Sequence, residues 1–177
     1  ITGEERGFDV ALFTIDKLLT SSNIAYAVTG ALAFGLHIPN NPRNTKDINL
    51  LIKKSDKAKL IKTLKDNQLK YREEDTYHLN IIKVAGLPVD VLFSFADTEL
   101  SGIVESKRAL LFGVTVSVIK PEYLAWMYLD SDRPQHKVDF TEMVKQKSLS
   151  INKLYDLLED DGDIYALEEL KRLTKIS

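Results

Sequence analysis

The stretch Asp47-Ile48-Asn49-Leu50-Leu51-Ile52 decides the fold, because it predicts a buried strand with two polar residues on one side. Side chains alternate between the two faces of a strand, so Asp47 and Asn49 are expected to point the same way. A second apolar run, Leu87-Pro88-Val89-Asp90-Val91-Leu92-Phe93, places a carboxylate in the middle of another strand. A buried charge is costly unless it is paired or bound to a cation. If the two strands are neighbours, Asp47, Asn49 and Asp90 converge on one point.

Two carboxylates and one amide oxygen form a ligand set that suits a hard cation such as Mg²⁺. The residues alone leave open whether Asn49, between Asp47 and Asp90, leaves a working metal site or a retired one. Each residue also has a plainer interpretation. Asp47 can be a cap or turn residue, and Asn49 can satisfy a backbone group. Asp90 is harder to explain in this way, since aspartate is disfavoured inside strands and in cores.

Length and composition indicate one domain with a small helical appendage. The chain has 177 residues, 44% of them hydrophobic, which is enough for a sizeable core. Its formal net charge is −2, so no overall electrostatic attraction to DNA or to a membrane surface is expected. No apolar run approaches the roughly 18 residues that span a bilayer.

The sequence contains no cysteine, which excludes disulfides, zinc–thiolate sites and cysteine nucleophiles. This composition fits a reducing compartment, and a cytoplasmic location is expected. The first residues, Ile1-Thr2-Gly3-Glu4-Glu5, have neither an initiator methionine nor a signal-peptide pattern, so we expect further residues upstream.

Periodicity and turn residues predict a mixed α/β half followed by helices. Strands are expected at 25–29, 47–52, 77–84, 87–94 and 109–119, and helices at 8–22, 31–37, 55–67, 97–108, 121–129, 136–147, 151–159 and 163–174. The turn-rich segment 38–44, which includes Pro42, is expected to be an exposed loop. Tyr123, Trp126 and Tyr128 share one helix in a pattern that suits core packing or a partner interface. We expect an α/β core over residues 1–120, with a mixed sheet of four or five strands, and a helical extension over residues 121–177 packed on it.

Three segments in this order resemble the nucleotidyltransferase superfamily. They are Val28-Thr29-Gly30-Ala31-Leu32-Ala33, then Pro42-Arg43-Asn44-Thr45-Lys46-Asp47-Ile48-Asn49-Leu50, then Val89-Asp90-Val91-Leu92. They are similar to the family's glycine turn, its strand with paired acidic residues, and its third aspartate. The later segments 119–127 and 137–140 are similar to the helical tail of small bacterial members, some of which belong to toxin–antitoxin or abortive-infection pairs.

The resemblance implies a nucleotidyltransferase-like α/β fold that binds a nucleoside triphosphate with Mg²⁺. Gly30 and Ala31 would bring backbone amides close to the phosphates at the start of a helix. Arg43 and Lys46 would offset phosphate charge, although without a ligand nearby both are simply solvated loop residues. Asp47 and Asp90 would hold the metal. The implied reaction moves a nucleoside monophosphate onto a hydroxyl of a protein, an RNA or a small molecule.

Two positions depart from the family pattern. Ala31 stands where a second Gly or Ser is usual, and Asn49 stands where an acidic residue is usual. An amide oxygen can bind Mg²⁺ but contributes no charge, so a second metal ion would be weakened more than the first. Nucleotide binding is therefore expected to survive better than turnover. Two alternatives stay open: a catalytically inactive member that acts as a binding or regulatory protein partner, and a plain α/β domain without a nucleotide role.

Overall fold

The computed structural model describes residues 6–41 and 43–174 of the chain. The expectations for the segment around Ile1 and for the turn at Pro42 lie outside these residues. Within the described part, no helix is both long and apolar enough to cross a membrane.

Strands and helices alternate through the first two thirds of the described chain, and helices alone follow. The strands are β1 (Tyr26–Thr29), β2 (Ile48–Ile52), β3 (Tyr71–Glu73), β4 (His78–Val84), β5 (Leu87–Phe93), β6 (Lys107–Leu111) and β7 (Val114–Val118). The α-helices are α1 (Arg6–Ser21), α2 (Gly30–His37), α3 (Lys57–Asp66), α4 (Asp97–Val104), α5 (Pro121–Leu129), α6 (Pro134–Lys145), α7 (Ile151–Asp161) and α8 (Ile164–Thr174), and a short 3₁₀ turn, η1 (Lys54–Asp56), precedes α3. This order confirms the expected mixed α/β fold.

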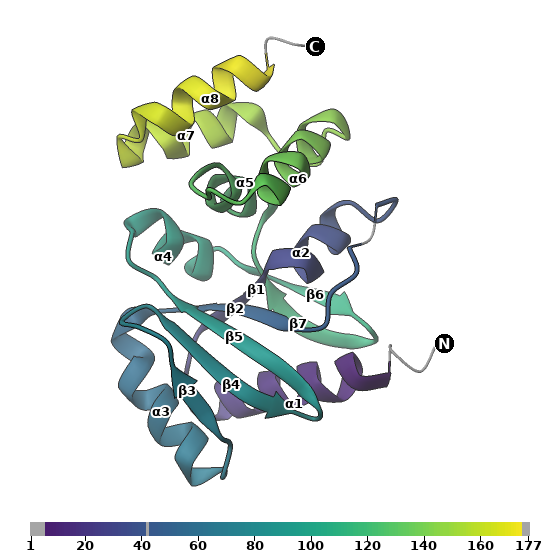
Figure 1. The fold of residues 1–177 in the computed structure, drawn as a ribbon, viewed down its shortest axis with the longest axis vertical. Helices are drawn as coiled ribbons and strands as arrows, with labels where there is room; N and C mark the ends of the chain where they lie inside the picture. Colours follow the sequence, from purple (N-terminus) through teal and green to yellow (C-terminus); the bar gives the residue numbers. More distant parts are fainter. Residues whose placement is uncertain (1–5, 42, 175–177) are drawn as a thin grey trace.

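The strands form one mixed sheet in the order β3-β4-β5-β2-β1-β7-β6. Strand β2 pairs parallel with β5, and β1 pairs parallel with β7, while the other pairs are antiparallel. Helices α1 and α3 lie on one face of the sheet, and α2 and α4 lie on the other (Figure 1). Helices α5 to α8 form a further layer beyond α2 and α4 (Figure 1).

The sheet has seven strands, so the expectation of four or five strands was wrong. The segment 109–119, expected to be strand-like with Gly113 at a turn or bulge, is part of the β6–β7 hairpin, which turns at Phe112 and Gly113, both with positive φ. Helix α4 ends at Val104, so Lys107 and Arg108 belong to β6 and not to the expected helix 97–108. The three-residue strand β3 was also missed.

Pro121 starts α5, as expected from the preference of proline for the first helical turn. The core-packing interpretation of this helix is confirmed, because Tyr123, Trp126 and Tyr128 are all buried. Helix α5 contacts α2 and α4 on one side and α6, α7 and α8 on the other. The C-terminal helices therefore reach the sheet layer chiefly through α5.

Candidate active site

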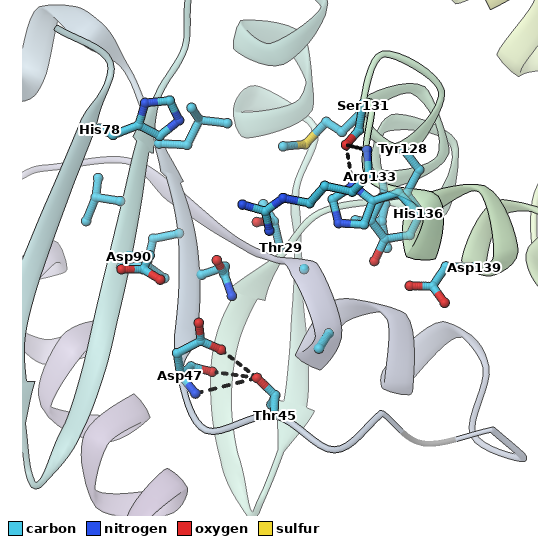
Figure 2. A pocket seen from close by; sticks show the side chains of 18 of the residues that line it. Thr29, Thr45, Asp47, His78, Asp90, Tyr128, Ser131, Arg133, His136 and Asp139 are labelled. Carbon is cyan, nitrogen blue, oxygen red and sulfur yellow. Dashed lines mark hydrogen bonds between the residues drawn. The ribbon is translucent and has the colours of Figure 1, made fainter. Parts of the chain in front are cut away.

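A cleft of about 1050 Å³ opens between the sheet and the C-terminal helices. Its walls combine the end of β1, the start of β2, the first residues of β4, the middle of β5, the first residues of α2 and the loop before β2. Helices α4, α5 and α6 and the α5–α6 connection complete the lining. The polar residues on these walls include Thr29, Arg43, Thr45, Asp47, Asn49, Glu74, His78, Asn80, Asp90, Glu99, Asp130, Ser131, Arg133, Gln135, His136 and Asp139. Figure 2 labels ten of the residues that line this cleft.

Four polar residues form a row across the floor of the cleft. Asn49 of β2 is paired with Thr29 of β1 on one side and with Asp90 of β5 on the other. Asp90 is in turn paired with Asn80 of β4. Directly paired residues project from the same face of a sheet, so all four side chains share one face. We call this set the polar row.

Gly30 follows the polar row directly and starts α2 with a φ of +62°. A Cβ atom at this position would lie 3.1 Å from both Cβ and Nδ2 of Asn49. Glycine is the residue that adopts such a φ at low cost and leaves room for the neighbouring side chain. The first backbone N–H groups of α2 have no intrahelical partners, and they begin at this edge of the cleft.

Two carboxylates face each other beside Asn49. Asp47 was expected to be part of the strand 47–52, but it lies in the bend before β2. There Thr45 Oγ1 donates a 2.6 Å hydrogen bond to Asp47 Oδ1 (Figure 2). Asp90 accepts a short hydrogen bond from Asn80 Nδ2. Burial raises the pKa of Asp90, and the neighbouring Asp47 and Glu74 carboxylates raise it further, against the lowering effect of Asn80.

This donor set fits one hard cation. Asp47, Asp90 and Asn49 supply oxygen atoms, and the two carboxylates oppose one another without a cationic side chain bonded to either in the described chain. Among the described residues, no group of three or more His, Cys, Asp or Glu side chains is placed to hold a metal ion. The charge available for a metal is therefore that of two carboxylates.

The residues expected to contact phosphate divide into two groups. Gly30, Ala31 and Arg43 line the cleft, whereas Lys46 is exposed and does not line it. Arg43 is already paired, since its Nη2 lies 3.0 Å from both carboxylate oxygens of the buried Asp139. Gln135 Nε2 completes this arrangement with a 3.0 Å hydrogen bond to Asp139 Oδ1. The pair joins the loop before β2 to α6.

Several cleft residues on the C-terminal side were not expected from the sequence. Ser131 Oγ lies 2.7 Å from His136 Nδ1 and accepts a 3.2 Å hydrogen bond from the Arg133 backbone N–H (Figure 2). The His136 ring stacks on Tyr128 with ring centroids 4.6 Å apart. Arg133 and His136 stand in a polar stretch that, without knowledge of the packing, looks like ordinary helix surface.

A buried acid, Glu99, forms another part of the wall. Its Oε2 accepts hydrogen bonds from the backbone N–H groups of Phe95 at 2.7 Å and Ala96 at 3.2 Å, which caps α4. Burial raises the pKa of Glu99, and the carboxylates of Asp130 and Asp161 add to the effect. This side of the cleft therefore has an excess of acidic groups.

No family model matches this chain. No curated protein matches it either. Several solved structures match this chain. The antibiotic-resistance factor ANT(2'')-Ia, in a solution structure, is 18% identical with a TM-score of 0.62, and the match covers 93% of this chain and 96% of that one. The crystal structure of ANT(2'')-Ia with adenylyl-2''-tobramycin is 17% identical, with a TM-score of 0.59 and coverage of 93% and 99%.

A nucleotidyltransferase-like protein from Paracoccidioides brasiliensis is 18% identical, with a TM-score of 0.53 and coverage of 95% of this chain and 94% of that one. These likenesses agree on one architecture. The chain has the nucleotidyltransferase fold, which confirms the resemblance seen in its glycine turn and its aspartate-bearing strands. At these identities the likeness concerns the fold, and the activity has to be argued from the cleft.

Proposed function

We propose that the protein binds a nucleoside triphosphate with Mg²⁺ in this cleft and transfers the nucleoside monophosphate to a hydroxyl acceptor. The observation that carries the proposal is the polar row beside the start of α2. Together with Asp47 from the bend before β2, the row brings two carboxylates and the Asn49 amide to the point where backbone N–H groups can meet phosphate oxygens. In the family pattern, the same fold elements hold the nucleotide.

Asp47, Asp90 and Asn49 would hold the metal. When bound, Mg²⁺ neutralises phosphate charge and polarises the phosphoryl group. Thr45 keeps Asp47 in place, and Asn80 orients Asp90 by its hydrogen bond to Oδ1. Gly30 leaves the space in which the phosphates approach the helix N-terminus.

In the proposed transfer, the acceptor hydroxyl oxygen forms a bond to the α-phosphorus. The bond from that phosphorus to the oxygen bridging the β-phosphate breaks, and pyrophosphate leaves with the electron pair. The hydroxyl proton is released to solvent. The residues of the chain contribute mainly by positioning the reactants and by stabilising charge, which is how phosphoryl transfer is generally catalysed.

We propose a small, hydroxyl-bearing amine as the acceptor, in preference to RNA or protein. Glu74, Glu99 and Asp130 add carboxylates to the cleft wall beyond those near the metal. Such a wall repels a polyanion such as RNA and attracts a cationic small molecule. A structural neighbour was solved with adenylyl-2''-tobramycin, an adenylylated product of this chemical kind.

The first test is a calorimetric titration of ATP, with GTP, CTP and UTP as comparisons, in the presence and absence of Mg²⁺. We expect Mg²⁺-dependent binding that is lost in Asp47→Ala. The matched control is Asp66→Ala, because Asp66 lies on the outer surface of α3 in an exposed ion pair with Lys62. If no nucleotide binds at millimolar concentration, the proposed function is wrong.

A second measurement separates an enzyme from a silent member of the fold. Release of pyrophosphate from ATP is followed with tobramycin as the first acceptor, and then with other amino sugars and amino alcohols. Acceptor-dependent release supports the transferase. Tight Mg²⁺–ATP binding without release for any acceptor supports the alternative, a catalytically inactive protein that acts through a partner.

A further inference from the structure

The triphosphate of the proposed nucleotide needs a positive partner in a cleft whose charged lining residues are mostly acidic. Backbone N–H groups at the start of α2 provide partial charge only. A side-chain cation close to the phosphates would stabilise them in the bound state and as pyrophosphate leaves. The cationic side chains near the cleft differ in whether they line it and in whether a carboxylate already pairs with them.

The cations expected from the sequence are poorly suited to it. Arg43 is held by the buried Asp139, with Nη2 at 3.0 Å from both carboxylate oxygens. Moving it to a phosphate would leave a buried carboxylate without its cation, which is costly. Lys46 is exposed and does not line the cleft.

The histidines of the cleft are also unsuitable. Burial lowers the pKa of His136, and the neighbouring guanidinium of Arg133 lowers it further, so the positive charge of this ring is disfavoured. His78 is exposed and its Nδ1 lies 2.8 Å from Asp75 Oδ2. The His136 ring is therefore a poor cation for a ligand, and the His78 ring is already paired with a carboxylate.

Arg133 differs from all of these. Its side chain extends from the α5–α6 connection into the cleft (Figure 2). Within the described residues, its guanidinium takes part in no ion pair, and only the backbone N–H of Arg133 forms a hydrogen bond with a side chain. It is an exposed residue, so its guanidinium is accessible to a ligand.

The backbone that carries Arg133 is nevertheless held firmly against α2. Phe34 of α2 contacts Tyr128 of α5 with ring centroids 6.5 Å apart, and Tyr128 stacks on His136 of α6. Ser131 Oγ bonds to the backbone of Arg133 and to the His136 ring. An anchored backbone with an uncommitted guanidinium is the arrangement expected of a ligand-binding arginine.

We propose that Arg133 binds the triphosphate of the nucleotide from the C-terminal side of the cleft, opposite the start of α2. The inference rests on the proposed nucleotide function and assigns the phosphate contact to a different residue from Arg43 and Lys46. The planar guanidinium can donate two parallel hydrogen bonds to one phosphate, which the ammonium of a lysine cannot do. In this role Arg133 stabilises the leaving pyrophosphate as well as the bound triphosphate.

The test compares ATP with AMP, which lacks the β- and γ-phosphates, by calorimetry in Mg²⁺. In Arg133→Ala we expect ATP affinity to fall by about tenfold to a hundredfold, the range for losing a charge-assisted hydrogen-bonded contact. AMP affinity should be unchanged. Arg133→Lys should give an intermediate ATP affinity, because it keeps the charge and loses the paired geometry.

The matched control is Lys137→Ala, which removes a positive charge from the exposed face of α6, away from the cleft lining. It should leave both affinities unchanged. If Arg133→Ala binds ATP as the unaltered protein does, or loses ATP and AMP affinity by the same factor, Arg133 is not the triphosphate ligand. In both cases the unaltered protein still binds ATP, so the proposed function stands. If the unaltered protein binds no nucleotide, the proposed function fails and this inference fails with it.

Discussion

Asn49 lies directly opposite Asp90 on the parallel strands β2 and β5, so an uncharged amide stands beside the one carboxylate of the polar row. Asp47 faces the same point from the bend before β2, and Gly30 leaves only 3.1 Å between Asn49 and a Cβ at its position. Residue 49 therefore decides whether two or three carboxylates meet at the centre of the cleft.

We predict that Asn49→Asp increases the response of the protein to Mg²⁺. A third carboxylate adds repulsion in the metal-free protein, so its free energy of unfolding should fall by about 1 to 2 kcal/mol. Mg²⁺ should restore the loss, and acceptor-dependent pyrophosphate release should rise. Urea unfolding with and without Mg²⁺ measures the first effect, and the pyrophosphate assay measures the second.

The control for this change is Asn152→Asp, which makes the same substitution at an exposed position in the first turn of α7. Its stability should not depend on Mg²⁺. Equal Mg²⁺ effects on the unaltered protein and on Asn49→Asp would show that residue 49 does not contact the metal.

Gly30→Ala should destabilise the protein by about 2 kcal/mol. The substitution combines a left-handed backbone conformation with a close approach of the new Cβ to Asn49. Gly162→Ala is the matched control, because Gly162 has a φ of +70° and a Cβ added there would meet no atom of the described chain within 4 Å. It should cost only about 1 kcal/mol, and an equal cost in both variants would mean that Asn49 moves aside freely.

Arg43→Ala should lower the free energy of unfolding by about 2 to 3 kcal/mol, because it leaves the carboxylate of Asp139 buried without its cation. The double variant Arg43→Ala/Asp139→Asn should be more stable than Arg43→Ala alone, since the charge is then gone. Chemical denaturation of the four proteins in this cycle gives the coupling energy between the two residues. A coupling near zero would contradict a structural role for the pair.

Glu105 is the source of an acid-sensitive contribution to stability. It receives hydrogen bonds from Lys120, Tyr123 and Lys153, and these contacts lower its pKa to about 2. A pKa lowered by folding stabilises the protein above the unfolded value near 4.5, and the contribution is lost as the pH falls toward 2.

The prediction for Glu105→Gln is a loss of about 1 kcal/mol at pH 7, a modest value because the side chain is 41% exposed and solvent screens its ion pairs. The difference between the two proteins should shrink steadily below pH 4. Unfolding free energies measured from pH 7 to pH 2.5 test this, and a difference that does not change with pH would assign the effect to packing.

Much of the fold could be predicted from the sequence because its strands are marked by apolar runs and clear turns. Strands β2 and β5 stand out in this way, and the turn at Ala85-Gly86 marks the β4–β5 hairpin. Strand β3 has no such signal: it is three residues long and its side chains are largely exposed. Lys107 and Arg108 hid the start of β6, because two charged residues are more typical of the end of a helix.

The candidate site could be predicted only where local sequence determines it. Asp47, Asn49 and Asp90 lie in or beside predictable strands, and all three line the cleft. Asn80 could not be found in this way. An unbroken ladder from the Val84–Leu87 pair would place Ile81 opposite Asp90, and an irregularity between Ile81 and Val84 brings Asn80 there instead.

Arg133 and the Arg43–Asp139 pair depend on long-range packing. Arg43 and Asp139 are 96 positions apart, and they meet because α6 lies against the loop before β2. No local pattern in the sequence carries this information. The same packing decides which arginine is committed to the fold and which is left for a ligand.

The polar row also affects the entropy of binding. Its four residues stand in β1, β2, β5 and β4, and each of these strands is paired with a neighbour on both sides. Their backbones are therefore ordered before any ligand arrives, and binding at the row loses little conformational freedom. Selection among ligands at the cleft floor then depends on charge and size, because ligand binding does not have to order the backbone there.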